Sequence, residues 1–261
     1  MTATNFIKVE RRGAVTTLTL DRPQAMNSLT LGMHYALQAA FDDFAADEGQ
    51  RVCVITGAGE AAFCAGSDLK AMAAGEAGPY PRCGYAGLSE RFDLAKPVIA
   101  AVNGLALGGG FEIALACDIV VAAETASFGL PEPLVGTVAL GGGLHRLPRQ
   151  IGLKPAMGLA LSSRRIAAAE AFRLGLVNEV VAAGGLGAAV DRWCDDILKG
   201  APLAIAATKE TMMRSLDEPD LASALKAQAA YPLFAAQAVS EDKAEGAQAF
   251  AAKRPPQWNG R

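Results

Sequence analysis

Hydrophobic and polar positions along the chain form segments that predict an α/β order. Residues 15–21, VTTLTLD, alternate with the period of a strand, and residues 51–57, RVCVITG, form a short apolar run ended by glycine. Three further apolar runs predict buried strands, at 96–104, 117–124 and 175–181. Residues 30–47 have helical spacing, and helical stretches at 109–116 and 143–151 separate strands. Strands that alternate with helices are typical of an α/β fold.

The pattern changes at about Pro202, where the strand signals stop and the chain reads as successive helices. Ser240, followed by two acidic residues, is typical of a capped helix start. The tail RPPQWNGR cannot continue a helix, because its two prolines lack a backbone N–H. We therefore expect an α/β core over residues 1–200 and a helical module over residues 201–261.

Composition and charge exclude several classes of partner. The chain has 261 residues, of which 51% are hydrophobic and 20% charged, with a net charge of −3. No basic block indicates nucleic acid, and no apolar run approaches the roughly 20 residues of a membrane span. The first residues, MTATNFIKVERRG, lack the apolar core of a signal peptide. We expect a cytoplasmic protein without a nucleic-acid or membrane partner.

The cysteines indicate reduced thiols. They are odd in number, widely spaced and without a CxxC pair: Cys53, Cys64, Cys83, Cys117 and Cys194. This pattern disfavours a zinc site or a disulfide framework. Because most of them lie among apolar residues, we expect small core side chains.

Two glycine-containing segments are candidates for binding a substrate oxygen. They are AFCAGSDLK, residues 62–70, and NGLALGGGFEIA, residues 103–114. Glycine lets a ligand approach the backbone closely, and the first amides of a helix have no intrahelical partner. Two such amides from separate loops form an oxyanion hole where they converge. The alternative is that Gly108–Gly110 only allow tight packing of a helix on a sheet, and the residues alone leave both open.

Two carboxylates are candidates for acid–base chemistry. Glu112 lies one turn into the apolar helix, and Glu132 lies between Pro131 and Pro133, which predict a stiff, extended loop. Two carboxylates held close in an apolar pocket acquire different pKa values, so that one serves as base and the other as acid. The alternatives are a buried ion pair between Glu112 and Arg146 and a solvated loop position for Glu132.

One motif points to a different chemistry. Gly57-x-Gly59-x-x-Ala62 follows a predicted strand and matches the relaxed dinucleotide-binding fingerprint. That fingerprint must open a helix, and here Gly66 interrupts the chain before a helix forms. We therefore do not expect a nicotinamide or flavin site.

Taken together, the motifs resemble the enoyl-CoA hydratase/isomerase, or crotonase, family. The resemblance rests on AFCAGSDLK, on KPVIAAVNGLALGGGFEIALACDIVVAAETASFGLPEPLVGT and on AEAFRLGLVNEVV, and it covers nearly the whole chain. It implies an α/β, crotonase-like spiral of ββα units that holds a CoA-thioester site. It also implies a C-terminal helical oligomerisation module that forms a homotrimer or a dimer of trimers.

The resemblance implies an enoyl-CoA hydratase, which adds water across the C2=C3 bond of a 2-enoyl-CoA thioester or removes it. By position, the Ser67 and Gly109 amides would form the oxyanion hole, and Glu112 and Glu132 would be catalytic. Ser67, Asp68, Leu69 and Lys70 would line the CoA site. The family needs no metal or redox cofactor, since coenzyme A is part of the substrate. The alternatives are a double-bond isomerase, a thioester hydrolase, and a non-enzymatic protein that binds CoA thioesters or RNA.

The chain departs from the family near the acyl end of the implied site. Ala139 and Leu140 replace a Pro-Gly pair that is typical of the hydratases, so the resemblance does not imply straight-chain specificity. His145 follows in the same segment, where a hydrogen-bonded residue in a first helical turn is the simpler interpretation. Residues 71–92 fall where the family builds its variable acyl pocket, and we expect Arg82 there to be solvated.

Overall fold

The computed structural model describes residues 6–261, which form two compact units. The first unit runs to Phe92 and continues over Val98–Arg192, and the second comprises Asp93–Pro97 and Trp193–Arg261. Helix α7 (Leu186–Leu198) contributes residues to both. None of the helices within residues 6–261 has the length and apolar character needed to cross a membrane.

A six-stranded sheet runs through the first unit in the order β1-β2-β3-β5-β7-β10. Its strands are β1 (Ile7–Arg12), β2 (Val15–Leu20), β3 (Val52–Gly57), β5 (Val98–Val102), β7 (Ile119–Ala123) and β10 (Glu179–Val181). Only β1 is antiparallel to its neighbour. The predicted strands are confirmed, although β10 begins four residues later than expected. Gly175 adopts a φ of +83° and ends the preceding helix, so the chain turns there before it enters the sheet.

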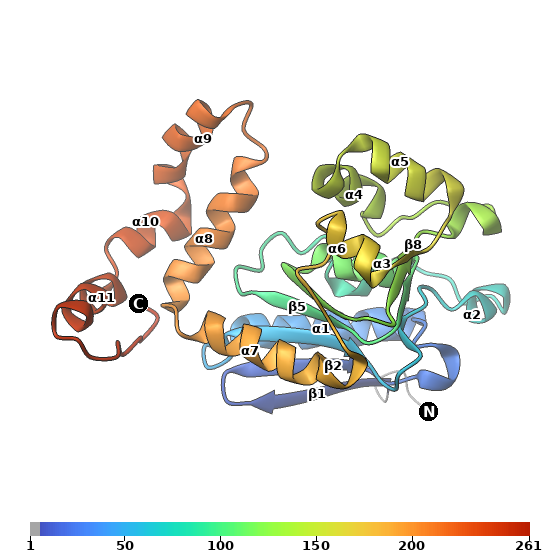
Figure 1. Cartoon of the computed structure of the whole chain (residues 1–261), viewed down its shortest axis with the longest axis horizontal. Helices are drawn as coiled ribbons and strands as arrows, with labels where there is room; N and C mark the ends of the chain where they lie inside the picture. The colour runs from blue at the N-terminus through green and yellow to red at the C-terminus, as the bar shows by residue number, and fades with distance from the viewer. Residues whose placement is uncertain (1–5) are drawn as a thin grey trace. The chain divides into compact units, whose positions relative to one another are not determined.

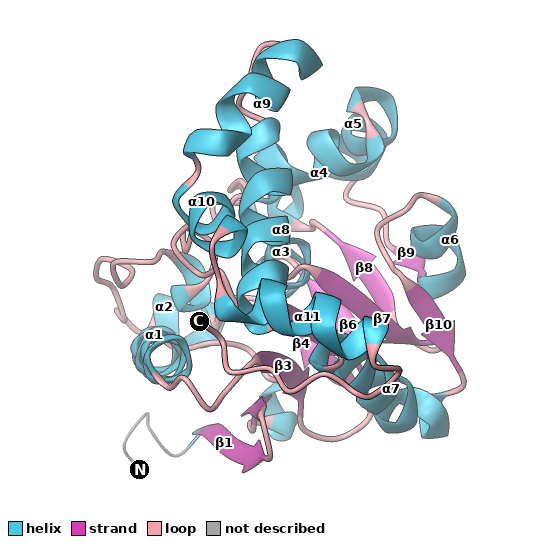
Figure 2. Cartoon of the chain, turned by 90° about the vertical axis from the view of Figure 1, so that its left-hand side faces the viewer, coloured by secondary structure: helices cyan, strands magenta, loops and turns pink. Residues whose placement is uncertain are grey.

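A second sheet of four short strands was not predicted. It has the order β4-β6-β8-β9, with β4 (Ala62–Cys64), β6 (Leu105–Leu107), β8 (Ser127–Gly129) and β9 (Ile166–Ala167). Strands of two or three residues are too short to show a period in the sequence. Figure 2 shows the strands of both sheets in magenta.

The two sheets are built by a repeated ββα unit. After β3, β5 and β7 of the first sheet, the chain enters β4, β6 and β8 of the second, and then a helix. These helices are α2 (Leu69–Ala73), α3 (Gly109–Ala116) and α4 (Gly143–Ile151). The expected α/β spiral is therefore confirmed, and the predicted bounds of α3 and α4 agree with the structure.

The segment with the dinucleotide fingerprint forms no helix. Gly57 ends β3, and β4 begins at Ala62. A side chain on Gly57 would overlap the carbonyl oxygens of Ala62 and Phe63. This glycine therefore serves the close packing of two backbone segments.

Helices cover the sheets of the first unit. Helix α1 (Leu31–Ala46) packs on β1 and β2, and it buries Leu37, Phe41 and Phe44 completely. Each such side chain contributes about 1.5–3 kcal/mol by leaving water. Helix α3 lies against β4, β6 and α4, and α4 packs beside α5 (Leu153–Ser162), as Figure 1 shows. The unit is completed by α6 (Ala168–Arg173).

Four helices make up most of the second unit. They are α8 (Pro202–Ser215), α9 (Leu221–Ala227), α10 (Pro232–Ala238) and α11 (Glu241–Ala251). The Ser240 hydroxyl accepts a hydrogen bond from the Lys243 amide at 3.1 Å, which confirms the predicted helix cap. Residues 220–238 split into α9 and α10 because Pro232 begins a new helix.

Candidate active site

Two backbone amides from separate loops have no partner at the N-terminus of α3. Gly108 adopts a φ of +54° and lets the chain turn from β6 into the helix that begins at Gly109. The Leu29 amide donates to the Gly66 carbonyl, and the Asp68 amide donates to the Leu29 carbonyl. The Ser67 amide lies between these two hydrogen bonds and takes part in neither. Within residues 6–261, neither the Ser67 nor the Gly109 amide donates to a protein atom.

The loops that carry these amides touch. A Cβ atom on Gly66 would lie 3.2 Å from the Gly109 nitrogen, so the backbone before Ser67 lies against the start of α3. The amides at a helix N-terminus point outward and favour negative charge. The structure therefore brings together the two segments that the sequence analysis paired.

Close packing also explains part of the glycine triplet. A side chain on Gly110 would overlap the carbonyl oxygen of Cys64 in β4. A side chain on Gly109 would overlap the hydroxyl and ring of Tyr85. Gly110 therefore allows α3 to pack closely on the sheet. Gly109 instead leaves room for Tyr85 next to the Gly109 amide, which has no partner within the described residues.

Glu112 is buried, with 2% of its surface exposed, one turn into α3. Its Oε1 atom accepts a hydrogen bond from the Gly143 amide at 2.8 Å. Burial raises the pKa of Glu112, and the amides of Gly143 and Gly141 and the charge of Arg146 partly offset that rise. No ion pair within 4 Å joins Glu112 to Arg146 in the described chain, and the Arg146 guanidinium donates instead to the Ser89 carbonyl.

Glu132 begins a short 3-10 helix, Glu132–Val135, so the prediction of an extended loop is wrong at this residue. Pro131 precedes it with a ψ of 4°, which turns the chain. Glu132 is half-buried and not a fully solvated loop residue: its Oε2 atom is buried and has no hydrogen-bond partner within residues 6–261. Burial raises the pKa of Glu132, a hydrogen bond from its own amide partly offsets that rise, and the charge of Glu112 raises the pKa further.

The two glutamates face the start of the same helix. A Cβ atom on Gly108 would lie 2.8 Å from the Glu132 Oε1 atom, and Glu112 projects from the first turn of α3. Two carboxyl groups with raised pKa values therefore lie beside the unpaired Gly109 amide. This is the arrangement that general acid–base chemistry on a polarised substrate requires.

The four residues expected at the CoA site differ in their surroundings. Asp68 is buried and caps α2 through the amides of Lys70 and Ala71, at 3.0 and 3.1 Å. Its carboxylate also pairs with Arg22 at 2.6 Å. Burial raises the pKa of Asp68, but the Ala71 amide and Arg22 outweigh it and hold the pKa below its usual value. Asp68 is thus engaged within the protein, whereas the side chains of Leu69 and Lys70 are exposed.

Tyr85 was missed by the sequence analysis. It is buried within residues 71–92, and its hydroxyl lies 3.2 Å from the Ser67 hydroxyl. The flanking Gly84 and Gly87, both with positive φ, were the signal of a tight turn that aims this side chain inward. Arg82, the residue singled out there, is exposed and pairs with Asp42 at 3.1 Å, as expected of a solvated arginine. His145 is exposed in the first turn of α4.

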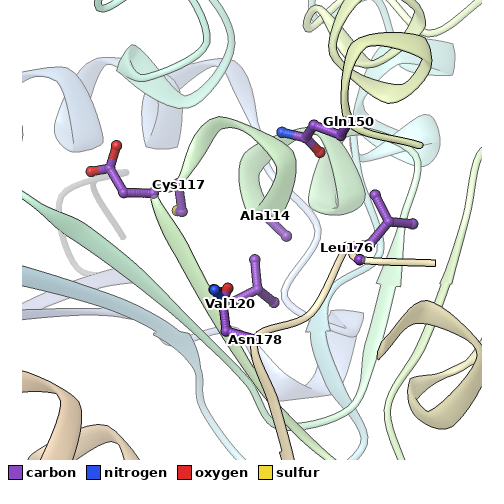
Figure 3. A pocket seen from close by; sticks show the side chains of 8 residues that line it. Ala114, Cys117, Val120, Gln150, Leu176 and Asn178 are labelled. Carbon is purple, nitrogen blue, oxygen red and sulfur yellow. The ribbon is translucent and has the colours of Figure 1, made fainter. Parts of the chain in front are cut away.

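A small cavity lies elsewhere in the first unit, as Figure 3 shows. It has a volume of about 170 Å³ and is lined by residues at the C-terminal end of α3, among them Ala114 and Cys117. Two of its polar side chains, Gln150 and Asn178, bond to the backbone at Leu115 and Val120. Neither Glu112 nor Glu132 is among the residues that line this cavity.

Comparisons with known proteins agree with this geometry. The enoyl-CoA hydratase/isomerase family matches residues 10–261. Carnitinyl-CoA dehydratases from Proteus mirabilis and Salmonella typhi are each 44% identical, over 96% and 98% of this chain and 97% and 98% of their own. The crystal structure of an enoyl-CoA hydratase from Mycobacterium marinum has a TM-score of 0.92 at 42% identity, and covers 98% of this chain and 99% of that chain. A hydratase structure from Mycobacterium tuberculosis H37Rv also has a TM-score of 0.92, at 39% identity, with the same coverage. The chain therefore belongs to the enoyl-CoA hydratase/isomerase, or crotonase, family.

Proposed function

We propose that the protein adds water across the C2=C3 double bond of a 2-enoyl-CoA thioester, or removes it in the reverse direction. The observation that carries the proposal is the pair Glu112 and Glu132, whose pKa values are both raised beside the N-terminus of α3. An isomerase needs a carboxylate to move one proton, whereas hydration uses two groups, one for the water and one for carbon.

The amides of Ser67 and Gly109 polarise the substrate. The thioester oxygen accepts both hydrogen bonds, which makes C3 electrophilic. As water attacks C3, negative charge builds on that oxygen as an enolate. Preorganised amides stabilise this charge more strongly than they stabilise the ground state, so they accelerate the reaction.

We assign the roles of the two glutamates from the groups around each carboxylate. Two amides, those of Gly141 and Gly143, and the charge of Arg146 favour the charged form of Glu112, whereas only its own amide does so for Glu132, so we take Glu112 as the base that accepts a proton from water. The Glu112 charge disfavours a second charge on Glu132, so Glu132 is the acid that delivers a proton to C2. In dehydration the same groups exchange roles.

The coenzyme A handle binds at residues 67–70. Leu69 and Lys70 present exposed side chains at the start of α2, next to the Ser67 amide. Binding energy from this remote part of the substrate holds the reacting carbons in place.

A second candidate is the dehydration of carnitinyl-CoA. The relatives that carry this name are 44% identical over nearly the whole chain. The reaction uses the same groups in the reverse direction, on a 3-hydroxyacyl thioester with a quaternary ammonium at C4. The two candidates differ in the acyl group alone.

A substrate panel tests both candidates. The purified protein is incubated with crotonyl-CoA, a 3-enoyl-CoA and carnitinyl-CoA, and products are identified by mass spectrometry. We expect a 3-hydroxyacyl-CoA from crotonyl-CoA, or loss of water from carnitinyl-CoA. Conversion of the 3-enoyl ester alone would replace the proposal with isomerisation, and release of free CoA would replace it with hydrolysis.

A further inference from the structure

Tyr85 is held rigidly by the chain around it. It lies in a tight turn in which the next residue, Ala86, adopts a φ of +55°, a conformation that alanine rarely takes. Helix α1 fixes this turn twice: His34 Nδ1 accepts from the Ala86 amide and Gln38 Oε1 from the Cys83 amide, each at 2.9 Å. A strained turn persists only where its surroundings determine it, so the position of the Tyr85 ring is tightly specified.

The Tyr85 hydroxyl lies beside the N-terminus of α3. It lies 3.2 Å from the Ser67 hydroxyl and overlaps the position of a Cβ on Gly109. In a helix the Cβ position is tilted toward the N-terminus, the direction in which the first amides also point. The hydroxyl therefore lies beside the Ser67 side chain and the Cα of Gly109, the two residues whose amides form the proposed oxyanion hole.

The Tyr85 side chain also lies near Glu112. A Cβ atom on Gly141 would lie 2.7 Å from the Glu112 Oε2 atom and 3.1 Å from Tyr85 Cβ. Burial raises the pKa of Tyr85 well above its usual value, the charge of Glu112 adds to that rise, and the hydrogen bond with Ser67 offsets only part of it. The phenol therefore stays protonated and available as a donor at neutral pH.

We propose that the Tyr85 hydroxyl donates a third hydrogen bond to the thioester oxygen, beside the Ser67 and Gly109 amides. Either hydroxyl of the Ser67–Tyr85 pair can donate to the other, and the proposal requires that Ser67 donates to the phenol oxygen, so that the phenol proton points into the hole. Tyr85 keeps its proton throughout, and its role is to stabilise the enolate. The inference rests on the proposed function, because it needs the thioester oxygen at Ser67 and Gly109.

A Tyr85→Phe variant tests the third donor, because it removes the hydroxyl and keeps the ring packed against His34. The readout is the apparent pKa of bound acetoacetyl-CoA, whose enolate is followed by ultraviolet absorbance. We expect the wild-type protein to lower this pKa and the variant to lower it less. We also expect kcat to fall roughly 10–100-fold with little change in KM, less than the loss from removing a sole donor, because two amides remain.

Tyr80→Phe is the matched control. Tyr80 belongs to the same ring cluster, with its centroid 5.5 Å from that of Tyr85, but its side chain is exposed. The variant should match the wild-type protein in both measurements. Ser67→Ala keeps the amide and removes the hydroxyl that orients the phenol, and we expect it to weaken the enolate shift less than Tyr85→Phe does.

The possible results separate the two proposals. If wild-type protein leaves the acetoacetyl-CoA pKa unchanged, the oxyanion hole itself is wrong, whatever the Tyr85 variant does. If the wild-type protein lowers it and Tyr85→Phe lowers it equally, the third donor is overturned while the hole stands. A fall in thermal midpoint without a change in the enolate shift would show a structural role and also overturn the inference. If Tyr85→Phe does not fold, Ser67→Ala provides the test. A Ser67→Ala variant that lowers the pKa of acetoacetyl-CoA as much as the wild-type protein does would overturn the third donor.

Discussion

The burial of Glu112 and Glu132 near the start of α3 costs folding stability. Glu112 and Glu132 lose hydration on folding, which raises the pKa of each, and the Oε2 atom of Glu132 has no partner. A buried polar atom without a hydrogen-bond partner lowers the free energy of unfolding. Such an atom is tolerated where a bound substrate or water supplies the missing hydrogen bond. Function and stability therefore make opposite demands on these two residues.

Replacing either glutamate should remove catalysis and spare binding. We expect Glu112→Gln and Glu132→Gln each to lower kcat by roughly 10²–10⁴, since the proton transfer is lost while the amides remain. The dissociation constant of a CoA thioester, measured by calorimetry, should stay nearly unchanged. Glu60→Gln, at an exposed position in the same unit, is the matched control. Activity close to wild type in both variants would leave the two-carboxylate mechanism without support.

Glu132→Gln should also stabilise the protein at neutral pH. The folded pKa of Glu132 is raised above its ordinary value of 4.5, so the folded state holds this proton more tightly than the unfolded state does. Stability from this group is therefore complete below about pH 4.5 and falls as pH rises through the folded pKa. The uncharged amide avoids that loss. Thermal midpoints should show the variant above wild type at pH 7, with a difference that shrinks toward pH 4; a difference independent of pH would contradict the assignment.

At the scale of the elements, the sequence of α3 reflects the close packing of this helix against its neighbours. Every residue from Gly109 to Leu115 is buried, and the helix lies against β4, β6 and α4. Gly110 admits the Cys64 carbonyl, while Gly109 admits Tyr85. Glycine costs a helix about 0.5–1 kcal/mol relative to alanine, so its presence here reflects contact and not helix formation.

Two glycine-to-alanine substitutions should therefore change stability in opposite directions. Gly110→Ala forces its methyl group into the Cys64 carbonyl, and we expect a loss of about 1–3 kcal/mol or more. Gly158→Ala lies in the exposed interior of α5, with nothing within 4 Å of the new methyl group. It should gain about 0.5–1 kcal/mol. Chemical denaturation of both variants gives the comparison, and equal effects would show that packing does not decide the glycine at residue 110.

The sequence predicts the long elements better than the short ones. The strands β2, β3, β5 and β7, of five or six residues, and the helices α1, α3 and α4 show a clear period and were found, whereas the six-residue β1 was not predicted, because it is exposed along its length after Ile7. The second sheet was not, because β4, β6 and β8 have three residues each and are defined by their neighbours in space. The place of Tyr85 in the site was not predicted for the same reason, because the turn at Ala86 and the contact with Ser67 are tertiary features. The pairing of the glycine segments with two glutamates was predictable, because each bears a local signature.

At the scale of the whole molecule, the second unit exposes more large apolar side chains than a solvated helical module requires. They are Met212, Met213, Leu216, Leu221, Leu225, Val239 and Phe250, each more than half exposed. Large exposed apolar patches mark interaction surfaces. Together with the resemblance to a family of trimers, this favours burial of these side chains between copies of the chain.

We therefore expect a trimer or a dimer of trimers at micromolar concentration. In a closed symmetric assembly every subunit buries the same apolar surface, so that no subunit leaves it exposed. A double variant, Leu216→Glu with Leu225→Glu, places two charges on the apolar face of α8 and α9 and should lower the mass measured by light scattering. Val9→Glu introduces the same charge at an exposed apolar residue of β1 and should leave the assembly intact. Circular dichroism establishes that the variants keep their helices, so that a lower mass reports assembly and not unfolding. A wild-type mass equal to one chain would show that the apolar side chains of the second unit face solvent, and would remove oligomerisation as the reason for them.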